Sequence, residues 1–276
     1  MIKFENTEVM GWEAAIRGMR NPMNSWEKGD SSPCNYPNDC YYKCNKVECE
    51  FGDHFYVGPN DQKLMMTLRS SGTDHRKFMR MIVVYTDITA PLYWWKEFDT
   101  YRTGVTPNPM DIEMNSCSTM HKIHAKEFDR GDFSHDHIPL GSDAYSDAWD
   151  IKHSGMFFCV NEEDEIYWSS EDILDYTIMA LNHYRKLYLE TKDKKYWWQM
   201  IQLLPSSYNQ KRTVMMNYEV LANIYKSRRN HKLDEWAETK LVGDCPSNMY
   251  PNKFANGFCD WIKTLPYSEL ITGEDK

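Results

Sequence analysis

Four residues in the C-terminal third combine polar and apolar groups at helical spacing. If one helix runs over about residues 211–229, then Asn217, Leu221, Ile224 and Arg228 share one stripe, because an α-helix has 3.6 residues per turn. An amide and a guanidinium would then bracket an apolar patch. Such a surface suits a planar heterocycle, with aliphatic contact on the ring face and directional donors at the ring edge. The alternative is an ordinary packed helix whose Asn and Arg are solvated.

A second row of polar and aromatic residues is predicted on a helix that Thr89 would cap. On the side opposite its apolar face, Trp94, Glu97 and Tyr101 line up, since residues three and four apart on a helix are neighbours. Arg102 follows directly and would suit a phosphate, because a guanidinium can donate two parallel hydrogen bonds. A surface ion pair with a nearby carboxylate is the alternative for Arg102.

Four of the eight cysteines cluster at Cys34, Cys40, Cys44 and Cys49. Four thiolates can close a tetrahedral zinc site, yet structural zinc sites favour two to four residues between paired ligands, and only part of this spacing agrees. A zinc ion here would brace an irregular excursion over about residues 29–58. Free thiols or a disulfide are the alternative.

Histidines and aspartates form another cluster in a polar stretch that reads as a surface loop. The H-x-x-H and H-x-H intervals would allow a transition metal, and with it hydrolase or oxygenase chemistry. Solvated loop histidines are the other interpretation, favoured by the Gly, Ser and Pro residues among them. The residues concerned are His121, His124, His135, His137, Asp129, Asp132 and Asp136.

Composition limits the class of protein. The 276 residues are 41% hydrophobic and 14% aromatic, enough to bury a sizeable core. A net charge of −9 argues against a nucleic-acid partner, because binding a polyanion draws on clustered Lys and Arg. No apolar run is long enough to cross a membrane, and the start of the chain lacks the features of a signal peptide. We expect a cytoplasmic protein with no membrane partner.

Local patterns predict an α+β fold with a mixed or antiparallel sheet and flanking helices. A β-branched run, RMIVVYTDI, predicts a buried strand. Helices are expected over 8–19, 61–69 and 195–204, near 254–263, and from a cap at Ser169 or Ser170 with an apolar stripe. No repeat and no long linker is present, so one domain over residues 1–276 is the simplest expectation.

Two segments resemble the flavin-dependent thymidylate synthases. The first runs from Asp74 through Ala90-Pro91 to Thr100-Tyr101-Arg102 and, after a spacer, to NSCSTMHK. It keeps the family's spacing from its characteristic histidine, here His75. The second contains Leu204-Pro205 followed by NYEVLANIYKSRRN, which matches the family's interval from a Leu-Pro pair to its flavin-binding Asn.

The resemblance implies roles for individual residues. His75, Tyr101, Arg102, Asn217 and Asn223 would hold FAD; Glu97, Asn115, Ser118 and Arg228 would contact a pyrimidine nucleotide. Arg228 would polarise the pyrimidine, since a fixed cation beside a carbonyl stabilises developing negative charge. Ser118 would assist as a second catalytic residue and would contact the nucleotide, or would satisfy backbone N–H groups at the start of a helix; both roles can hold together.

The pattern departs from the family at four matched positions. Met120, Ile201 and Glu219 replace arginines, and two such arginines usually grip the substrate phosphate. Charged hydrogen bonds contribute about 1.5–3 kcal/mol each. Losing both phosphate-binding arginines without replacement would therefore lower the affinity for dUMP by roughly two to four powers of ten. Nearby cations that would substitute are Lys122, Lys211, Arg212 and Arg229. Glu97 replaces a Gln, exchanging a donor and acceptor for an acceptor alone.

Taken together, the resemblance implies a one-carbon transfer to C5 of a pyrimidine nucleotide, as from dUMP to dTMP. FAD would be the cofactor, methylene-tetrahydrofolate and NADPH the co-substrates, and a homotetramer the assembly. The chemistry would place the protein in nucleotide biosynthesis as a flavoprotein methyltransferase. Two alternatives stay open: a catalytically diverged nucleotide- or flavin-binding or oligomeric scaffold protein, and a metal-dependent enzyme that uses the His and Asp loop.

Overall fold

The computed structural model describes residues 2–33, 55–103, 112–139, 169–239 and 257–274. These residues form two compact units. One contains residues 90–93 and 117–210; the other contains residues 2–89, 94–116 and 211–276 except where the chain is not described. No helix in the described part is both long and apolar enough to span a membrane.

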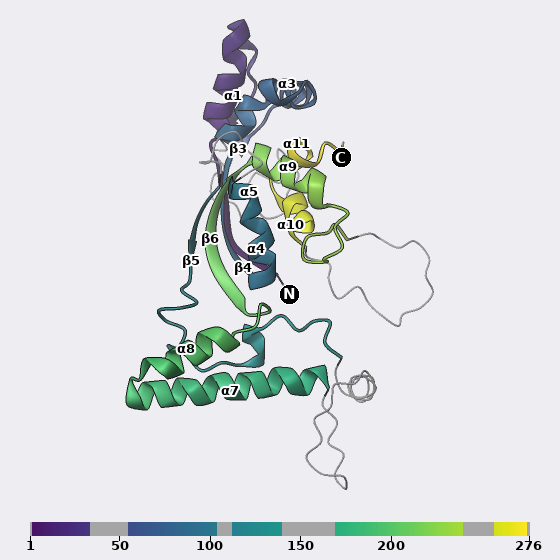
Figure 1. Cartoon of the computed structure of the whole chain (residues 1–276). Helices are drawn as coiled ribbons and strands as arrows, with labels where there is room; N and C mark the ends of the chain where they lie inside the picture. The colour runs from purple at the N-terminus through teal and green to yellow at the C-terminus, as the bar shows by residue number, and fades with distance from the viewer. Residues whose placement is uncertain (1, 34–54, 104–111, 140–168, 240–256, 275–276) are drawn as a thin grey trace, which may run out of the picture. The chain divides into compact units, whose positions relative to one another are not determined.

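The larger unit is built on a four-stranded sheet in the order β1-β4-β6-β5 (Figure 1). The strands are β1 (Lys3–Met10), β4 (Val83–Pro91), β5 (Glu113–Ser116) and β6 (Asn209–Asn217), with the ends of β4 and β6 continuing into the smaller unit. β1 pairs antiparallel with β4, and β5 pairs antiparallel with β6. The α+β class predicted from sequence is confirmed.

Helices flank this sheet. They are α1 (Trp12–Arg20), α3 (Pro59–Ser70), α4 (Leu92–Phe98), α5 (Thr100–Thr103), α9 (Tyr218–Arg228), α10 (Phe258–Thr264) and α11 (Glu269–Thr272). Three 3-10 helices are also present in the described part of this unit: η1 (Asn21–Met23), η2 (Trp26–Lys28) and η4 (Thr73–Met81). A second sheet has two antiparallel strands, β2 (Ser32–Pro33) and β3 (Phe55–Tyr56). In Figure 1, α4, α9 and α10 lie on the same side of the sheet.

Aromatic packing fixes α4 in place. Trp94, Trp95 and Phe98 of α4 are fully buried, and Trp94 stacks on Trp236 with ring centroids 4.5 Å apart. Phe258 of α10 completes this aromatic cluster at 5.4 Å from Trp236. Each buried aromatic pair adds about 0.5–1.5 kcal/mol beyond the area that it removes from water. The cluster therefore holds the helix that carries Glu97.

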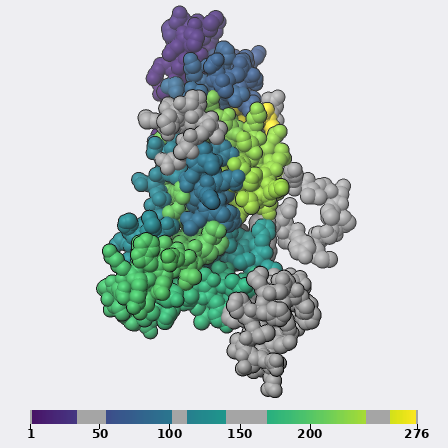
Figure 2. All heavy atoms as spheres, viewed as in Figure 1, coloured from purple at the N-terminus to yellow at the C-terminus, as the bar shows by residue number. Residues whose placement is uncertain are grey.

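The smaller unit contains η5 (Arg130–Asp132) and a pair of helices, α7 (Ser170–Thr191) and α8 (Lys194–Leu203). Figure 2 shows their side chains packed against each other. Ser169 caps α7 through a capping box with Asp172, as the sequence predicted. The apolar stripe of α7 packs into the hydrophobic core of the smaller unit. Leu174, Ile178 and Leu181 are buried there, with Tyr184 and Tyr188 packed partly against them.

Three element boundaries differ from the prediction. The segment expected as a helix from about 211 is strand β6 up to Asn217, and α9 begins only at Tyr218. The helix expected from Glu8 begins at Trp12, because β1 runs to Met10 and Gly11 makes the turn at φ +94°, where a Cβ would lie 2.1 Å from the Met81 carbonyl oxygen. Thr89 lies inside β4 and caps no helix.

The other expected helices are present. They occupy α3, α8 and α10, within a few residues of the predicted bounds. The cysteine cluster at Cys34, Cys40, Cys44 and Cys49 lies outside the described residues, so the predicted zinc site stays a prediction. The single domain predicted over residues 1–276 stays a prediction.

Candidate functional site

The side chain of Arg228 lies at the centre of a polar and aromatic cluster in the larger unit. Its Nε donates to the Tyr101 hydroxyl at 2.5 Å, and its Nη1 donates to Oε1 of Glu97. The guanidinium carbon also lies over two rings, 5.3 Å from the centroid of Tyr101 and 5.1 Å from that of Trp236. His231 approaches the same Glu97 oxygen at 3.5 Å. We call these five residues the Arg228 cluster.

Local structure explains how distant segments meet here. Glu97 lies on α4 and Tyr101 on α5, close enough in sequence to share one side, while Arg228 is the last residue of α9. Trp236 follows α9 on a turn in which its backbone N–H donates to Leu233. Because Trp236 is fully buried against Trp94, it fixes both the aromatic wall and the position of α4.

The donors of Arg228 are only partly used. A guanidinium carries five N–H groups, and the contacts to Glu97 and Tyr101 use two of them. The arginine side chain is 16% exposed and that of Glu97 is 28% exposed, so both charges are reached by solvent. Among the described residues, the other three N–H groups have no protein acceptor and remain to meet a ligand or water, beside a carboxylate that offsets the positive charge.

Tyr101 is buried, and burial raises the pKa of its phenol above the ordinary value, against the lowering effect of the Arg228 hydrogen bond. The phenol is therefore neutral near pH 7. Its oxygen accepts from Arg228, which leaves its own proton to donate. The cluster thus offers guanidinium and phenol donors, a carboxylate acceptor and a flat aromatic surface.

Asn217 and Asn223 lie at different places on α9. Asn217 is buried and caps the helix, accepting from the backbone N–H of Val220 at 3.0 Å. It therefore precedes the helix on which Leu221, Ile224 and Arg228 lie, and the single stripe predicted for these four residues is wrong. Asn223 is partly buried five residues before Arg228 and so lies on a different side of the helix.

Two further predicted flavin contacts, His75 and Arg102, and one predicted nucleotide contact, Asn115, lie elsewhere in the larger unit. His75 is exposed on η4, an element that packs against α9. Arg102 lies in α5, but its side chain is outside the described part. Asn115 is exposed on β5, opposite Thr213 of β6. The structure thus joins Glu97, Tyr101 and Arg228 directly, and the roles of the others stay predictions.

Ser118 belongs to the smaller unit. It is exposed, and its hydroxyl accepts from the backbone N–H groups of Met120 at 3.3 Å and His121 at 2.8 Å. The hydroxyl thus satisfies backbone N–H groups, as one alternative predicted, but residues 119–126 form turns and bends and not the start of a helix. A hydroxyl has a second lone pair and a proton, so capping leaves its predicted contact with a nucleotide untested.

Glu219, for which the sequence resemblance predicted an arginine, pairs with Arg80 of η4. The Glu219 side chain is 7% exposed, so its charge is offset in a partly buried site and does not stand alone against an anion. Three of the cations proposed to replace the missing arginines are also paired with carboxylates. Lys211 pairs with Glu5 and Asp87, Arg212 with Asp99, and Arg229 with Glu274.

Several polar side chains of the histidine and aspartate loop contact nearby residues of the same loop. Asp129 and Asp132 form a capping box around η5, and Asp132 also pairs with Lys126. His135 bonds the Phe133 carbonyl through Nδ1 at 2.8 Å, and burial lowers the pKa of His124. Within the described ranges, no three His, Cys, Asp or Glu side chains gather closely enough to hold a metal ion.

The sequence did not single out Trp236, His231 or Arg80. Trp236 and His231 follow Arg228 within eight residues, so a search for aromatic or titratable neighbours would have raised them. Arg80 gave no comparable signal, because its partner Glu219 is far away in sequence.

No protein-family model matches this chain. No curated protein matches it either. Among solved structures, the chain is similar to the flavin-dependent thymidylate synthase ThyX from Helicobacter pylori complexed with FAD and dUMP. The identity is 15%, the match covers 84% of this chain and 88% of that one, and the TM-score is 0.49. A second structure of ThyX from Helicobacter pylori with FAD and dUMP gives 14% identity, 84% and 86% coverage, and a TM-score of 0.48.

Proposed function

We propose that this protein binds a pyrimidine nucleotide and a flavin, and that it transfers a one-carbon unit to C5 of the pyrimidine ring. The observation that carries the proposal is the Arg228 cluster. Glu97 and Tyr101 come from one of the two segments that resemble flavin-dependent thymidylate synthases, and Arg228 comes from the other. Their direct contact is what a shared site for a planar ring requires.

The chemistry of the cluster suits a uracil or cytosine ring. Both rings present a carbonyl or ring nitrogen that accepts, next to an N–H or amino group that donates. Arg228 would donate to the acceptor, and Glu97 would accept from the neighbouring donor. A cation fixed at that edge would stabilise negative charge as C5 becomes nucleophilic, and the aromatic rings would offer the pyrimidine a flat apolar surface.

For the flavin, the described residues supply groups that fit a ring system. The His75 imidazole and the Asn223 amide would contact the flavin, since neither side chain contacts a polar group of another described residue. Tyr101 would add a donor at the edge of the flavin ring. When bound, a flavin supplies the hydride that completes a reductive methylation. Methylene-tetrahydrofolate as carbon source, NADPH as reductant and a homotetramer as assembly belong to the same proposal.

The test begins with the visible spectrum of the purified full-length protein with and without added FAD. A yellow protein whose flavin bands shift on titration with dUMP or dCMP supports the proposal. Arg228→Ala should remove the nucleotide-dependent shift, because it deletes the guanidinium donors and the positive charge at the ring edge. Lys226→Ala is the matched control: it is exposed on the same helix and should leave the response intact.

Each result that contradicts the proposal indicates a different function or a different site. A colourless protein that binds neither FAD nor nucleotide contradicts it and favours a scaffold. A protein that holds stoichiometric zinc and no flavin favours metal chemistry. A flavoprotein whose response to dUMP survives Arg228→Ala removes Arg228 from the site.

A further inference from the structure

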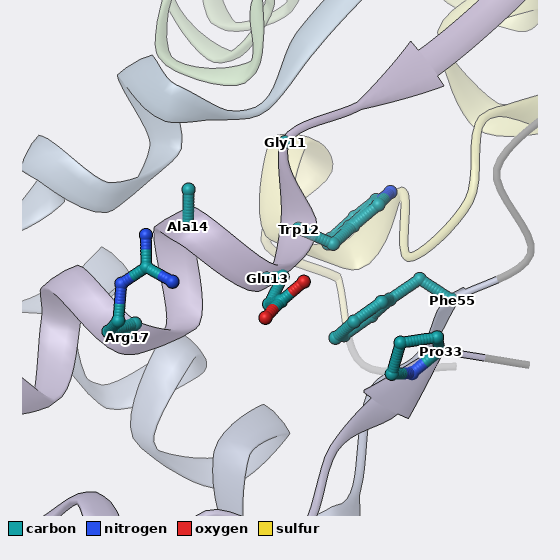
Figure 3. A pocket seen from close by; sticks show the side chains of 7 residues that line it. All are labelled: Gly11, Trp12, Glu13, Ala14, Arg17, Pro33 and Phe55. Atoms are coloured by element: carbon teal, nitrogen blue, oxygen red, sulfur yellow. The ribbon is translucent and has the colours of Figure 1, made fainter.

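A cavity lies beside α1, within the larger unit and among residues that the proposed function does not use. One part encloses about 530 Å³ and an adjoining part about 360 Å³. Glu13, Arg17 and Phe55 line both parts, and Figure 3 shows them in the smaller part. Volumes of this size hold small organic molecules.

Two opposite charges on α1 face the cavity without pairing. Glu13 and Arg17 are one helical turn apart, at the spacing that usually forms a surface ion pair. In the described part of the chain neither side chain has an ion-pair or hydrogen-bond partner, and both are exposed. In the view of Figure 3, Glu13 stands between Arg17 and the ring of Phe55.

Three aromatic side chains, Trp12, Trp26 and Phe55, also line the cavity. Trp26 is 52% exposed, yet its orientation is fixed because Nε1 donates to Oδ1 of Asn21 at 2.9 Å. Phe55 is partly buried on β3, and Trp12 is buried with its edge against Tyr218. A large aromatic ring held in place beside solvent offers a stacking face to a ligand.

The floor of the cavity is rigid. Arg20 and Asp61 form an ion pair of 2.7 Å there, with exposed side-chain fractions of 5% and 0%. Arg20 also donates to the carbonyl oxygens of Ser25 and Lys28. Its donors are therefore engaged within the protein, and Arg17 is the cation that remains for a ligand.

We propose that this cavity binds a small zwitterion with an aromatic body, such as a free aromatic amino acid. Arg17 holds the carboxylate, Glu13 holds the ammonium group, and Phe55 with Trp26 contacts the ring. The assignment follows from the lining: a ligand with one charge leaves the opposite side chain of α1 unmatched, and a ligand without a ring leaves the aromatic wall exposed to water. This site is separate from the Arg228 cluster.

Calorimetric titration of the full-length protein tests this with four probes: L-phenylalanine, phenethylamine, 3-phenylpropionate and glycine. L-Phenylalanine should bind at least about tenfold more tightly than each of the other three, because each lacks one charged hydrogen bond or the ring contact. Glu13→Gln should remove the advantage over 3-phenylpropionate, and Arg17→Gln the advantage over phenethylamine.

Lys63→Gln, an exposed change on α3 outside the cavity lining, should alter none of these affinities. Thermal melting of each variant checks that it is folded, which is expected because Glu13 and Arg17 are exposed. The proposal is overturned if L-phenylalanine gives no binding up to about 10 mM, beyond the range of specific weak sites. It is also overturned if the single-charge probes bind as tightly, or if both variants match the unmodified protein.

Discussion

The ion pair between Arg20 and Asp61 is the interaction whose loss should weaken the fold most clearly. Asp61 is fully buried, and its two oxygens face different donors. Oδ1 accepts from Nε of Arg20 at 2.7 Å; Oδ2 accepts from the backbone N–H groups of Asp30 at 3.0 Å and Ser31 at 3.1 Å, and from the Ser31 hydroxyl at 2.6 Å. The side chain thus ties α3 to α1 and to the loop between η2 and β2.

Asp61→Asn keeps the shape of this side chain but places an amide NH₂ where one oxygen stood. Turned toward Arg20, the NH₂ faces a buried donor; turned toward Ser31, it faces two backbone N–H groups. Either orientation also leaves the Arg20 charge without its partner. Removing one member of a buried ion pair costs about 3–5 kcal/mol.

At about 2 °C per kcal/mol for a chain of this size, Asp61→Asn should lower the melting temperature by about 6–10 °C at pH 7. Circular dichroism melts of the variant, the unmodified protein and Lys63→Gln provide the comparison. Lys63 is exposed on the same helix, so its substitution should change the free energy of unfolding by at most about 0.5 kcal/mol. A loss for Asp61→Asn no larger than that of Lys63→Gln would refute the reasoning.

The pH dependence gives a second check. Burial by itself raises the pKa of Asp61, but the hydrogen bonds from Ser31 and Arg20 outweigh it and the pKa lies below its ordinary value. A lowered pKa in the folded state stabilises the protein above the unfolded pKa of about 3.9, and that contribution is lost as the pH falls through the folded value. The gap in melting temperature between the two proteins should therefore be full at pH 7 and close below about pH 4.

Three further predictions concern single side chains. Tyr101→Phe should lower the free energy of unfolding by about 1–2 kcal/mol, because Nε of Arg228 loses its acceptor; denaturant titration measures this, and an unchanged midpoint contradicts it. Glu219→Gln should cost about 1 kcal/mol or less, since its partner Arg80 is half exposed and screened, and a loss of several kcal/mol at high salt would show a different role. Cys259, whose thiol pKa is raised by burial to about 12, should resist alkylation at pH 8 while exposed Cys117 reacts, as peptide mapping by mass spectrometry would show.

The sequence predicted the elements that carry their own signals. Helix α7 could be found because Ser169 caps it and an apolar stripe continues from Leu174. The boundary between β6 and α9 was missed because no Gly or Pro separates them and both contain apolar residues at short intervals. Asn217, taken as part of a helical stripe, was in fact the start signal: its side chain caps α9. If Asn217 had been interpreted as an N-cap, the start of α9 would have been predicted at Tyr218.

In the candidate site, too, local patterns predict some neighbours, while others meet only through tertiary contacts. Glu97 and Tyr101 are four residues apart, so local helical geometry places them together before any fold is known. Their contacts with Arg228 join residues more than a hundred apart in sequence, and no local pattern predicts them. The resemblance implied only that Glu97 and Arg228 contact the same nucleotide. Trp236 enters the site through stacking on Trp94, a tertiary contact that no local pattern encodes.

The pairing of Arg228 with Glu97 makes a prediction about what the proposed site recognises. A guanidinium beside a carboxylate has little net charge, so attraction should come mainly from the ring edge and less from a phosphate. Glu97→Gln removes the negative charge and leaves Arg228 positive. The variant should therefore raise the affinity for dUMP relative to deoxyuridine by about three- to tenfold at low salt, and added salt should reduce that gain. Calorimetric titration of both ligands measures the ratio. If the ratio stays the same while both ligands still bind, then the charge of Glu97 does not act on the nucleotide, and its contact with Arg228 serves only to hold α4 against the end of α9.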